Sequence, residues 1–127
     1  MVDSILLINT MQIEEGKLED FKESVKNSLA FVQANGPQLI VEVYVDEENM
    51  RAYSFQFYDD SESILSHWQM SDPYIRDVMQ HITVERLDIY GWPNDAVMEG
   101  FRPFFEDGVI VTATPRFAGF ARLQASE

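Results

Sequence analysis

The sequence predicts an α+β domain in which two helices cover one face of an antiparallel sheet. Segments with the spacing of strands and of amphipathic helices follow one another in the order strand, helix, strand, strand, helix, strand. The chain has 127 residues, of which 46% are apolar, so it can bury one core without disulfides or metals. We find no repeat, linker or second core, and we expect a single domain over residues 1–127.

The first strand and helix are predicted from periodicity and from the residues that end the helix. Residues 4–13 are mostly apolar or β-branched, which favours a strand. Gly16 opens the helix, and Gly36 in "NGP" is expected to end it in the left-handed conformation. Apolar residues recur between these glycines at helical spacing, namely Leu18, Phe21, Val25, Leu29 and Val32.

A hairpin and a second helix are expected next. Residues 38–45 and 51–58 have the composition of strands, and "DEEN" between them is a turn. Asp59 and Glu62 have the spacing of a capping box, which predicts a helix beginning near Asp60.

An Asp-Pro pair is expected to interrupt this second helix. Asp72 can cap a new turn that has Pro73 in its first position. The apolar face then continues to residue 82, and residues 83–90 form the fourth strand. The order βαββαβ is the ferredoxin-like plan, with both helices on one face of the sheet. Beyond this core of about residues 4–93 we expect a short helix near 95–105, a strand at 109–114 and a final extended stretch, "FAGFARL".

Two of the predicted strands are apolar on both sides. In the first strand, Ile5 and Leu7 point one way while Leu6 and Ile8 point the other, and residues 38–45 repeat the pattern. Two helices cover only one side of a sheet, so the extension or a second copy of the chain must cover the other. We expect a homodimer in which the open faces meet about a two-fold axis.

Composition excludes several classes of function. The chain has 22 acidic and 9 basic residues, and its net charge of −13 repels nucleic acids and anionic membranes. With no cysteine, thiolate chemistry is impossible, and the two histidines show no metal-binding spacing. No apolar run is long enough to cross a bilayer, and the first residues lack a basic leader, so we expect a cytoplasmic protein.

Three stretches of the sequence are informative together: "SILLINTMQIEEGKLEDFKESV", "DDSESILSHWQMSDPYIRDV" and "ERLDIYGWP", which span roughly residues 4–93. They resemble the antibiotic biosynthesis monooxygenase family of the dimeric α+β barrel superfamily. "PRFAGFARL" is similar to the C-terminal part of the longer members. The resemblance implies a pocket in each subunit between the sheet and its helices. Some members oxygenate quinols or polyketide aromatics without metal, flavin or haem, because the ionised substrate activates oxygen. Other members degrade haem, and many have no known activity.

Asn9 is the sharpest candidate for a site residue. It is the one polar residue on an apolar strand face made of Ile5, Leu7, Met11 and Ile13. An unpaired buried amide costs about 1–3 kcal/mol, so a partner is required. That partner is either the protein itself or a ligand. In the haem-degrading branch of the family an asparagine on the first strand lines the site, which implies a ligand-binding role for Asn9.

Trp68 and His67 are the candidates on the second helix. Trp68 falls on the apolar face, where it is either core or the wall of an aromatic-binding pocket. His67 lies one position aside, so it is either a satisfied or exposed histidine at the rim or a general base. In the haem-degrading branch the axial histidine follows a tryptophan of this helix by ten residues. That position is Val78 here, and His81 lies three residues further on, which disfavours haem.

Four weaker candidates complete the predicted site. Tyr74 and His81 follow the Asp-Pro pair and could face the pocket. Arg86 and Tyr90 share one face of the fourth strand, where Arg86 could instead pair with Asp88 or with a carboxylate of a partner subunit.

The resulting hypothesis is a cofactor-independent monooxygenase of a small aromatic or quinol-type substrate. Asn9 would orient the substrate, Trp68 would wall it, and His67 or His81 would handle the proton. Tyr74, Arg86 and Tyr90 are expected to contact the substrate. The alternatives are a non-catalytic dimer that binds a small hydrophobic ligand and, third, a haem-binding protein.

Overall fold

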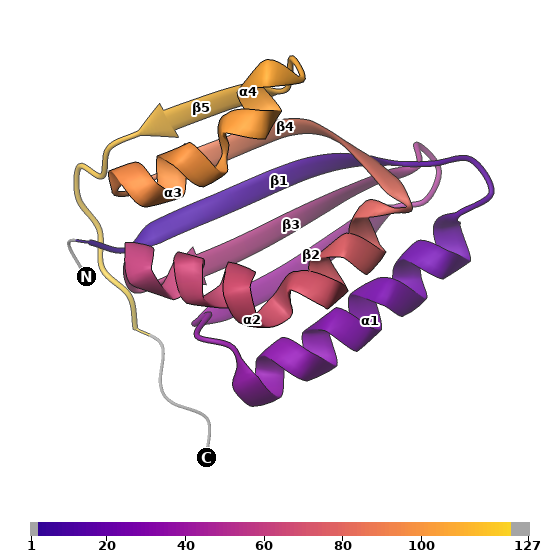
Figure 1. Ribbon diagram of the computed structural model, residues 1–127, viewed down its shortest axis with the longest axis horizontal. Coiled ribbons are helices and arrows are strands. Elements are labelled where there is room, and N and C mark those ends of the chain that lie inside the picture. Colours follow the sequence, from indigo (N-terminus) through magenta and orange to yellow (C-terminus); the bar gives the residue numbers. More distant parts are fainter. Residues whose placement is uncertain (1–2, 123–127) are drawn as a thin grey trace.

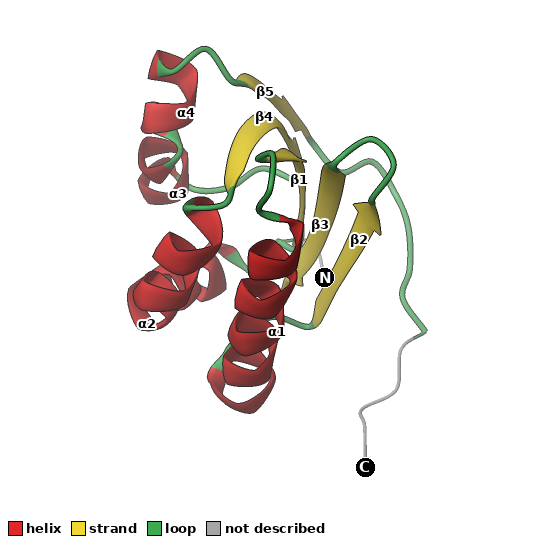
Figure 2. Ribbon diagram, turned by 90° about the vertical axis from the view of Figure 1, so that its right-hand side faces the viewer, coloured by secondary structure: helices red, strands yellow, loops and turns green. Residues whose placement is uncertain are grey.

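The computed structural model describes residues 3–122. Its elements are β1 (Ile5–Ile13), α1 (Leu18–Asn35), β2 (Ile40–Asp46), β3 (Arg51–Tyr58), α2 (Ser61–Met79), β4 (Ile82–Tyr90), α3 (Asp95–Gly100), α4 (Arg102–Glu106) and β5 (Ile110–Thr114). The strands form one sheet in the order β2-β3-β1-β4-β5, in which β5 is parallel to β4 and the other neighbours are antiparallel. The helices all lie on one side of it (Figures 1 and 2). The α+β, ferredoxin-like prediction is confirmed.

The core between the sheet and the helices is divided into two clusters. Ile5 and Leu7 of β1 belong to the first cluster, which continues through α2 and α3. Met11 and Ile13 of β1 belong to the second, which includes Phe21 of α1. Asn9 lies between the two pairs on the same face of β1. The apolar core is therefore interrupted at the polar residue.

The two helices of the extension pack on the helix side of the sheet, and only its segment after β5 approaches the open side among the described residues (Figure 2). Two short helices, α3 and α4, replace the single helix expected near 95–105, and β5 lengthens the sheet beside β4. Trp68 of α2 packs edge-on against Phe101, with ring centroids 5.1 Å apart. Gly100 makes room for this contact, because a Cβ there would lie 2.3 Å from the indole. In the final stretch "FAGFARL", Leu123 lies outside the described residues.

Two local predictions about helix ends are wrong. The N-cap of α2 is Asp60 rather than Asp59, and its carboxylate accepts a hydrogen bond from Ser63 N at 2.8 Å. Gly36 is extended, with φ −85° and ψ 161°, and is not left-handed. A side chain at Gly36 would crowd Gln38 and Val32. Glycine is required here because these two residues lie close to its Cα.

The Asp-Pro pair does not interrupt α2. The helix runs through Pro73, whose ring is exposed, so the carbonyl that loses its amide partner faces solvent. Asp72 does not cap a new turn; its carboxylate pairs with Arg76 one helical turn later at 2.9 Å. The stretch is therefore one helix that keeps His67, Trp68 and Tyr74 in fixed relation.

The sheet face opposite the helices, which we call the outer face, is rich in aromatic residues. Tyr44 and Phe55 pack edge-on there, and a broad groove is lined by these rings together with Leu6, Ile40, Tyr53 and Phe57. Among the described residues only the segment after β5 approaches this face, through Phe120 and Ala121 (Figure 2). None of the helices in residues 3–122 has the length and apolar character required to cross a bilayer.

Candidate functional site

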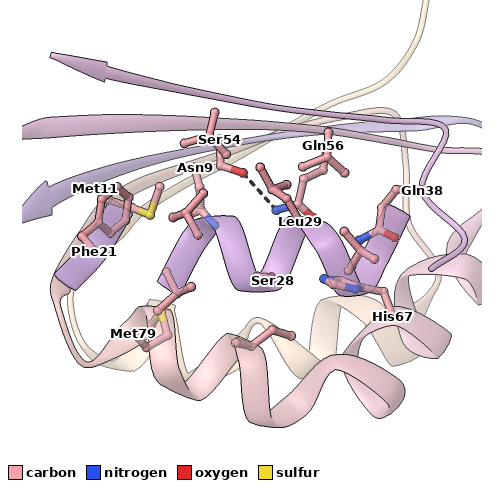
Figure 3. Close-up of a pocket in the computed structure, with 16 residues that line it drawn as sticks. Asn9, Met11, Phe21, Ser28, Leu29, Gln38, Ser54, Gln56, His67 and Met79 are labelled. Atoms are coloured by element: carbon pink, nitrogen blue, oxygen red, sulfur yellow. Dashed lines mark hydrogen bonds between the residues drawn. The ribbon is translucent and has the colours of Figure 1, made fainter. Parts of the chain in front are cut away.

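A cavity of about 120 Å³ lies between the sheet and helices α1 and α2 (Figure 3). Apolar side chains from α1, α2 and β2 form most of its wall. Its polar wall residues are Asn9, Ser28, Gln38, Ser54, Gln56 and His67. An apolar cavity of about 150 Å³ is known to hold one benzene ring, so this space suits a single ring.

Asn9 enters the cavity wall from the middle of β1. Its Cα partner across the β1–β3 ladder is Ser54, and both side chains line the cavity. The Oδ1 atom of Asn9 is buried, and none of the described residues donates a hydrogen bond to it. The expected protein partner is therefore not found for this oxygen within residues 3–122. A buried amide without full satisfaction is a position where a ligand can add binding energy.

His67 is buried and lines the same cavity from the opposite side. It is 7% exposed, and Figure 3 shows its ring among the wall residues of α2. Its Nδ1 lies 2.9 Å from Ser71 Oγ one turn further along α2, which fixes the ring. No described residue bonds Nε2, so that nitrogen is free for a ligand. Burial lowers the pKa of His67 to about 4, so the imidazole is neutral at pH 7.

Comparisons with solved structures bear on this arrangement. No family model and no curated protein matches the chain. SnoaB from Streptomyces nogalater, a cofactor-independent oxygenase, is 10% identical and superposes with a TM-score of 0.60 over 72% of this chain and 95% of that one. A Caulobacter crescentus protein, proposed to be an antibiotic biosynthesis monooxygenase, is 15% identical. It superposes with a TM-score of 0.59 over 68% of this chain and 85% of that one.

The chain has the antibiotic biosynthesis monooxygenase fold. The resemblance seen in the sequence is thereby confirmed at the level of the fold, which is monooxygenase-like. MupZ from Pseudomonas fluorescens extends the likeness to the whole chain, with a TM-score of 0.73 at 14% identity over 98% of both chains. The C-terminal extension is therefore shared with a protein of known structure. Identities this low establish the common fold and leave the chemistry to the residues of the cavity.

The expected positions of Trp68 and His67 are reversed within this monooxygenase-like fold. Trp68 does not line the cavity, because its ring packs on Phe101 of the extension. His67 was expected at a rim and is instead buried at the cavity wall. The two side chains leave α2 on different flanks, one toward the sheet and one toward the extension.

The other candidates on and after α2 also lie outside the cavity. Tyr74 stacks on Phe31 across the outer crevice between α1 and α2, with ring centroids 4.6 Å apart. His81 follows α2, and its backbone carbonyl accepts a hydrogen bond from Glu14 N at 2.9 Å. Its Nδ1 is buried, and no described residue bonds it. Neither residue contacts the space that Asn9 and His67 share.

Arg86 and Tyr90 lie on the outer face of β4, away from the cavity. Arg86 Nε pairs with Asp88 at 2.8 Å, as the structural alternative anticipated. Asp88 also accepts a hydrogen bond from Thr112 Oγ1 at 2.6 Å, which ties β4 to β5. The hydrogen bond and charge of Arg86 hold the pKa of Asp88 below its usual value. Tyr90 is 43% exposed, so both residues belong to the open face of the sheet.

Five polar residues of the site were missed by the sequence analysis. They are Ser28, Gln38, Ser54, Gln56 and Ser71. The signal for two of them was present in "RAYSFQFY", where Ala52, Ser54 and Gln56 alternate with aromatic residues. Such a strand has one small or polar face and one aromatic face, and the polar face is the one turned toward the helices.

Haem does not fit this site. The space suits one ring rather than a macrocycle, and Val78, at the position where the haem-degrading branch has its axial histidine, lines the cavity with an apolar side chain. His67 is the cavity's histidine in the described part of the chain, and its Nδ1 is engaged by Ser71. Within residues 3–122 no group of three His, Cys, Asp or Glu side chains could hold a metal ion.

Proposed function

We propose that this protein is a cofactor-independent monooxygenase of a one-ring phenol or hydroquinone. The observation that carries the proposal is the convergence of Asn9 and His67 from opposite walls on a cavity sized for one ring. The fold shared with SnoaB, a cofactor-independent oxygenase, supports it. Asn9 orients the ring through its amide. His67 acts in the tautomer whose Nδ1–H donates to Ser71 Oγ, so that the unprotonated Nε2 accepts the proton of a ring hydroxyl.

The substrate itself supplies the electrons in this reaction. Hydroquinone and O₂ give hydroxyquinone and water: one oxygen atom enters a ring C–H bond as a hydroxyl, and the other leaves as water. The ring loses four electrons, two in hydroxylation and two in oxidation to the quinone, and O₂ gains the same four. The protein binds the ring, removes a proton and excludes water, so no cofactor is required by the electron balance. We assign this activity to the cytoplasm.

Oxygen consumption with a panel of one-ring hydroquinones tests the proposal. We expect the wild-type protein to consume one O₂ per ring and the Asn9→Ala variant to lose about 10- to 100-fold in kcat/KM, as expected for the loss of one or two hydrogen bonds. Trp68→Phe is the control, because Trp68 packs away from the cavity and its replacement leaves the rate unchanged. Binding of the hydroquinone without any oxygen uptake would instead identify a small-molecule binding protein of the same fold.

We also infer a homodimer formed through the outer face. The aromatic groove on this face is open to solvent, and the adjoining C-terminal segment exposes Phe117 and Phe120 by 99% and 82%. Such a patch is larger than the isolated apolar side chains normal on a monomer. Two identical faces can cover each other about a two-fold axis.

Mass measurement over a range of protein concentrations tests the dimer. We expect a dimer whose melting temperature rises with protein concentration. Phe55→Lys, which puts a charge in the middle of the outer face, should give a monomer. Trp92→Lys is the matched control, because Trp92 is 71% exposed and its replacement leaves the mass unchanged. A wild-type monomer at all concentrations would disprove the interface.

A further inference from the structure

We propose that Ser54 is the hydrogen-bond donor that stabilises the anionic oxygen of the bound ring, and that Gln56 and Tyr58 are positioning residues that aim it. The inference rests on the proposed function for the one-ring phenolic ligand. It adds a binding role for three residues that form one polar row on β3. The chemical class it selects is a phenol that binds as its phenolate.

The three residues link the core to the cavity. They alternate along the inward face of β3, with aromatic residues on the outward face. Tyr58 has no exposed surface and belongs to the first core cluster. Gln56 and Ser54 line the cavity, with Ser54 directly opposite Asn9 in the β1–β3 ladder.

The hydrogen bonds in this row all point the same way. Burial raises the pKa of Tyr58 well above its usual value, so the hydroxyl keeps its proton and must donate it. It donates to Gln56 Oε1 at 2.5 Å, which turns the amide nitrogen of Gln56 toward Ser54. That nitrogen donates to Ser54 Oγ at 3.1 Å, as the dashed line in Figure 3 shows. Each bond in such a chain polarises the next.

Ser54 is left with a proton to give. Its oxygen is occupied as an acceptor by Gln56, and no described residue receives its hydroxyl proton. A donor held in a mostly apolar wall stabilises an anionic oxygen more than a neutral one, and it needs no reorganisation to do so. A phenolic oxygen seated against Ser54 Oγ is the group that fits this end of the row.

Proton transfer to His67 requires a donor such as the Ser54 hydroxyl, because the transfer leaves a phenolate in the cavity. When the ring hydroxyl transfers its proton to Nε2, the O–H bond breaks, the N–H bond forms, and the electron pair stays on the phenolic oxygen. A phenol with a pKa of about 10 facing an imidazole with a pKa of about 4 is unfavourable by about six units, a factor of about a million. Stabilising the phenolate is therefore the main requirement of the step, and the imidazolium formed nearby contributes to it.

The acid dissociation of bound 4-nitrophenol tests the inference without turnover, because the phenolate is yellow and the phenol is not. We expect the pKa of the bound ligand to be about one to two units lower in the wild-type protein than in Ser54→Ala, a 10- to 100-fold change in the ionisation constant. Ser54→Thr keeps a hydroxyl and should restore the wild-type value. Gln56→Leu and Tyr58→Phe, which leave Ser54 in place but unaimed, should each give part of the Ser54→Ala shift.

Ser66→Ala is the matched control, since Ser66 lies on α2 and does not line the cavity. The 4-nitrophenol bound to this variant should have the same pKa as the 4-nitrophenol bound to the wild-type protein. Equal pKa values in the wild-type protein and Ser54→Ala would overturn the role of Ser54 while leaving oxygen consumption to decide the proposed function. A wild-type protein that does not bind 4-nitrophenol would overturn the one-ring site itself, and this inference with it.

Discussion

In the His67→Asn variant, oxygen consumption with hydroquinone is expected to fall by about 10²- to 10⁴-fold, the usual contribution of a general base. The amide of asparagine can still bond Ser71 Oγ in place of Nδ1, but it provides nothing at the position of Nε2. Binding of the ring should change little. Steady-state kinetics and equilibrium binding of the same ligand separate the two effects.

His67→Gln is the matched control for this prediction. The amide of glutamine reaches the position of Nε2 but cannot act as a base near neutral pH. The His67→Gln variant should therefore be as inactive as His67→Asn, although its amide restores any contact that Nε2 makes with the ring. If either variant retains more than about a tenth of the wild-type rate, proton transfer to His67 is not part of the reaction.

The pH dependence of stability provides a second measurement on the same variant. The folded protein keeps His67 neutral down to a pKa of about 4, whereas an unfolded histidine takes up a proton near pH 6.5. The unfolded state therefore binds more protons between these values, and stability is lost as the pH falls through this window. The loss is roughly 3 kcal/mol at most, and it should be missing from His67→Asn when denaturant unfolding is compared at pH 7 and pH 4.5.

Phe21→Ala is expected to lower the free energy of unfolding by about 3–5 kcal/mol. Phe21 has no exposed surface, belongs to the second core cluster and lines the cavity from α1. Removing its ring should also enlarge the cavity, so that the variant binds a two-ring dihydroxynaphthalene that the wild-type protein rejects. Denaturant unfolding and ligand titration measure the two consequences on one variant.

Phe105→Ala is the control for the stability effect. Phe105 lies on α4 and is 50% exposed, so its replacement should change the free energy of unfolding by no more than about 0.5 kcal/mol. If the wild-type protein binds the two-ring ligand as tightly as it binds hydroquinone, the cavity does not select ligands by size. The proposed one-ring substrate would then be wrong even if the stability prediction holds.

The order of elements could be predicted from the sequence because each segment has a clear periodicity. Strand β3 was predicted with the bounds that the structure gives, and α1 was placed to within about two residues. The start of α2 was predicted correctly, but its apolar face was extended to Ile82, which is the first residue of β4. The break expected at Pro73 was wrong for a physical reason. A proline on the solvent side of a helix leaves its unpaired carbonyl in water, and the packing of the other side keeps the helix intact.

The site was only partly predictable. Asn9 could be found because a single polar residue in an apolar row requires an explanation. The burial of His67 could not, because the second helix was expected to bury only the apolar face that carries Trp68, with His67 one position aside. In the structure α2 contacts two partners, the sheet on one flank and the extension on the other, so its buried surface is wider. The contact with the extension is long-range and leaves no local signal in the sequence.

The packing of Trp68 decides what intrinsic fluorescence can report about this protein. One indole is packed against Phe101 and fitted over Gly100, and the other, Trp92, is largely in solvent. Neither ring lines the cavity. A red shift of the tryptophan emission therefore follows the release of α3 and α4 from α2, because the Trp68 ring then enters water. A ring ligand that enters the cavity leaves the emission of both tryptophans largely unchanged. The chain reports optically on the attachment of its extension, whereas occupancy of the cavity has to be read from the ligand.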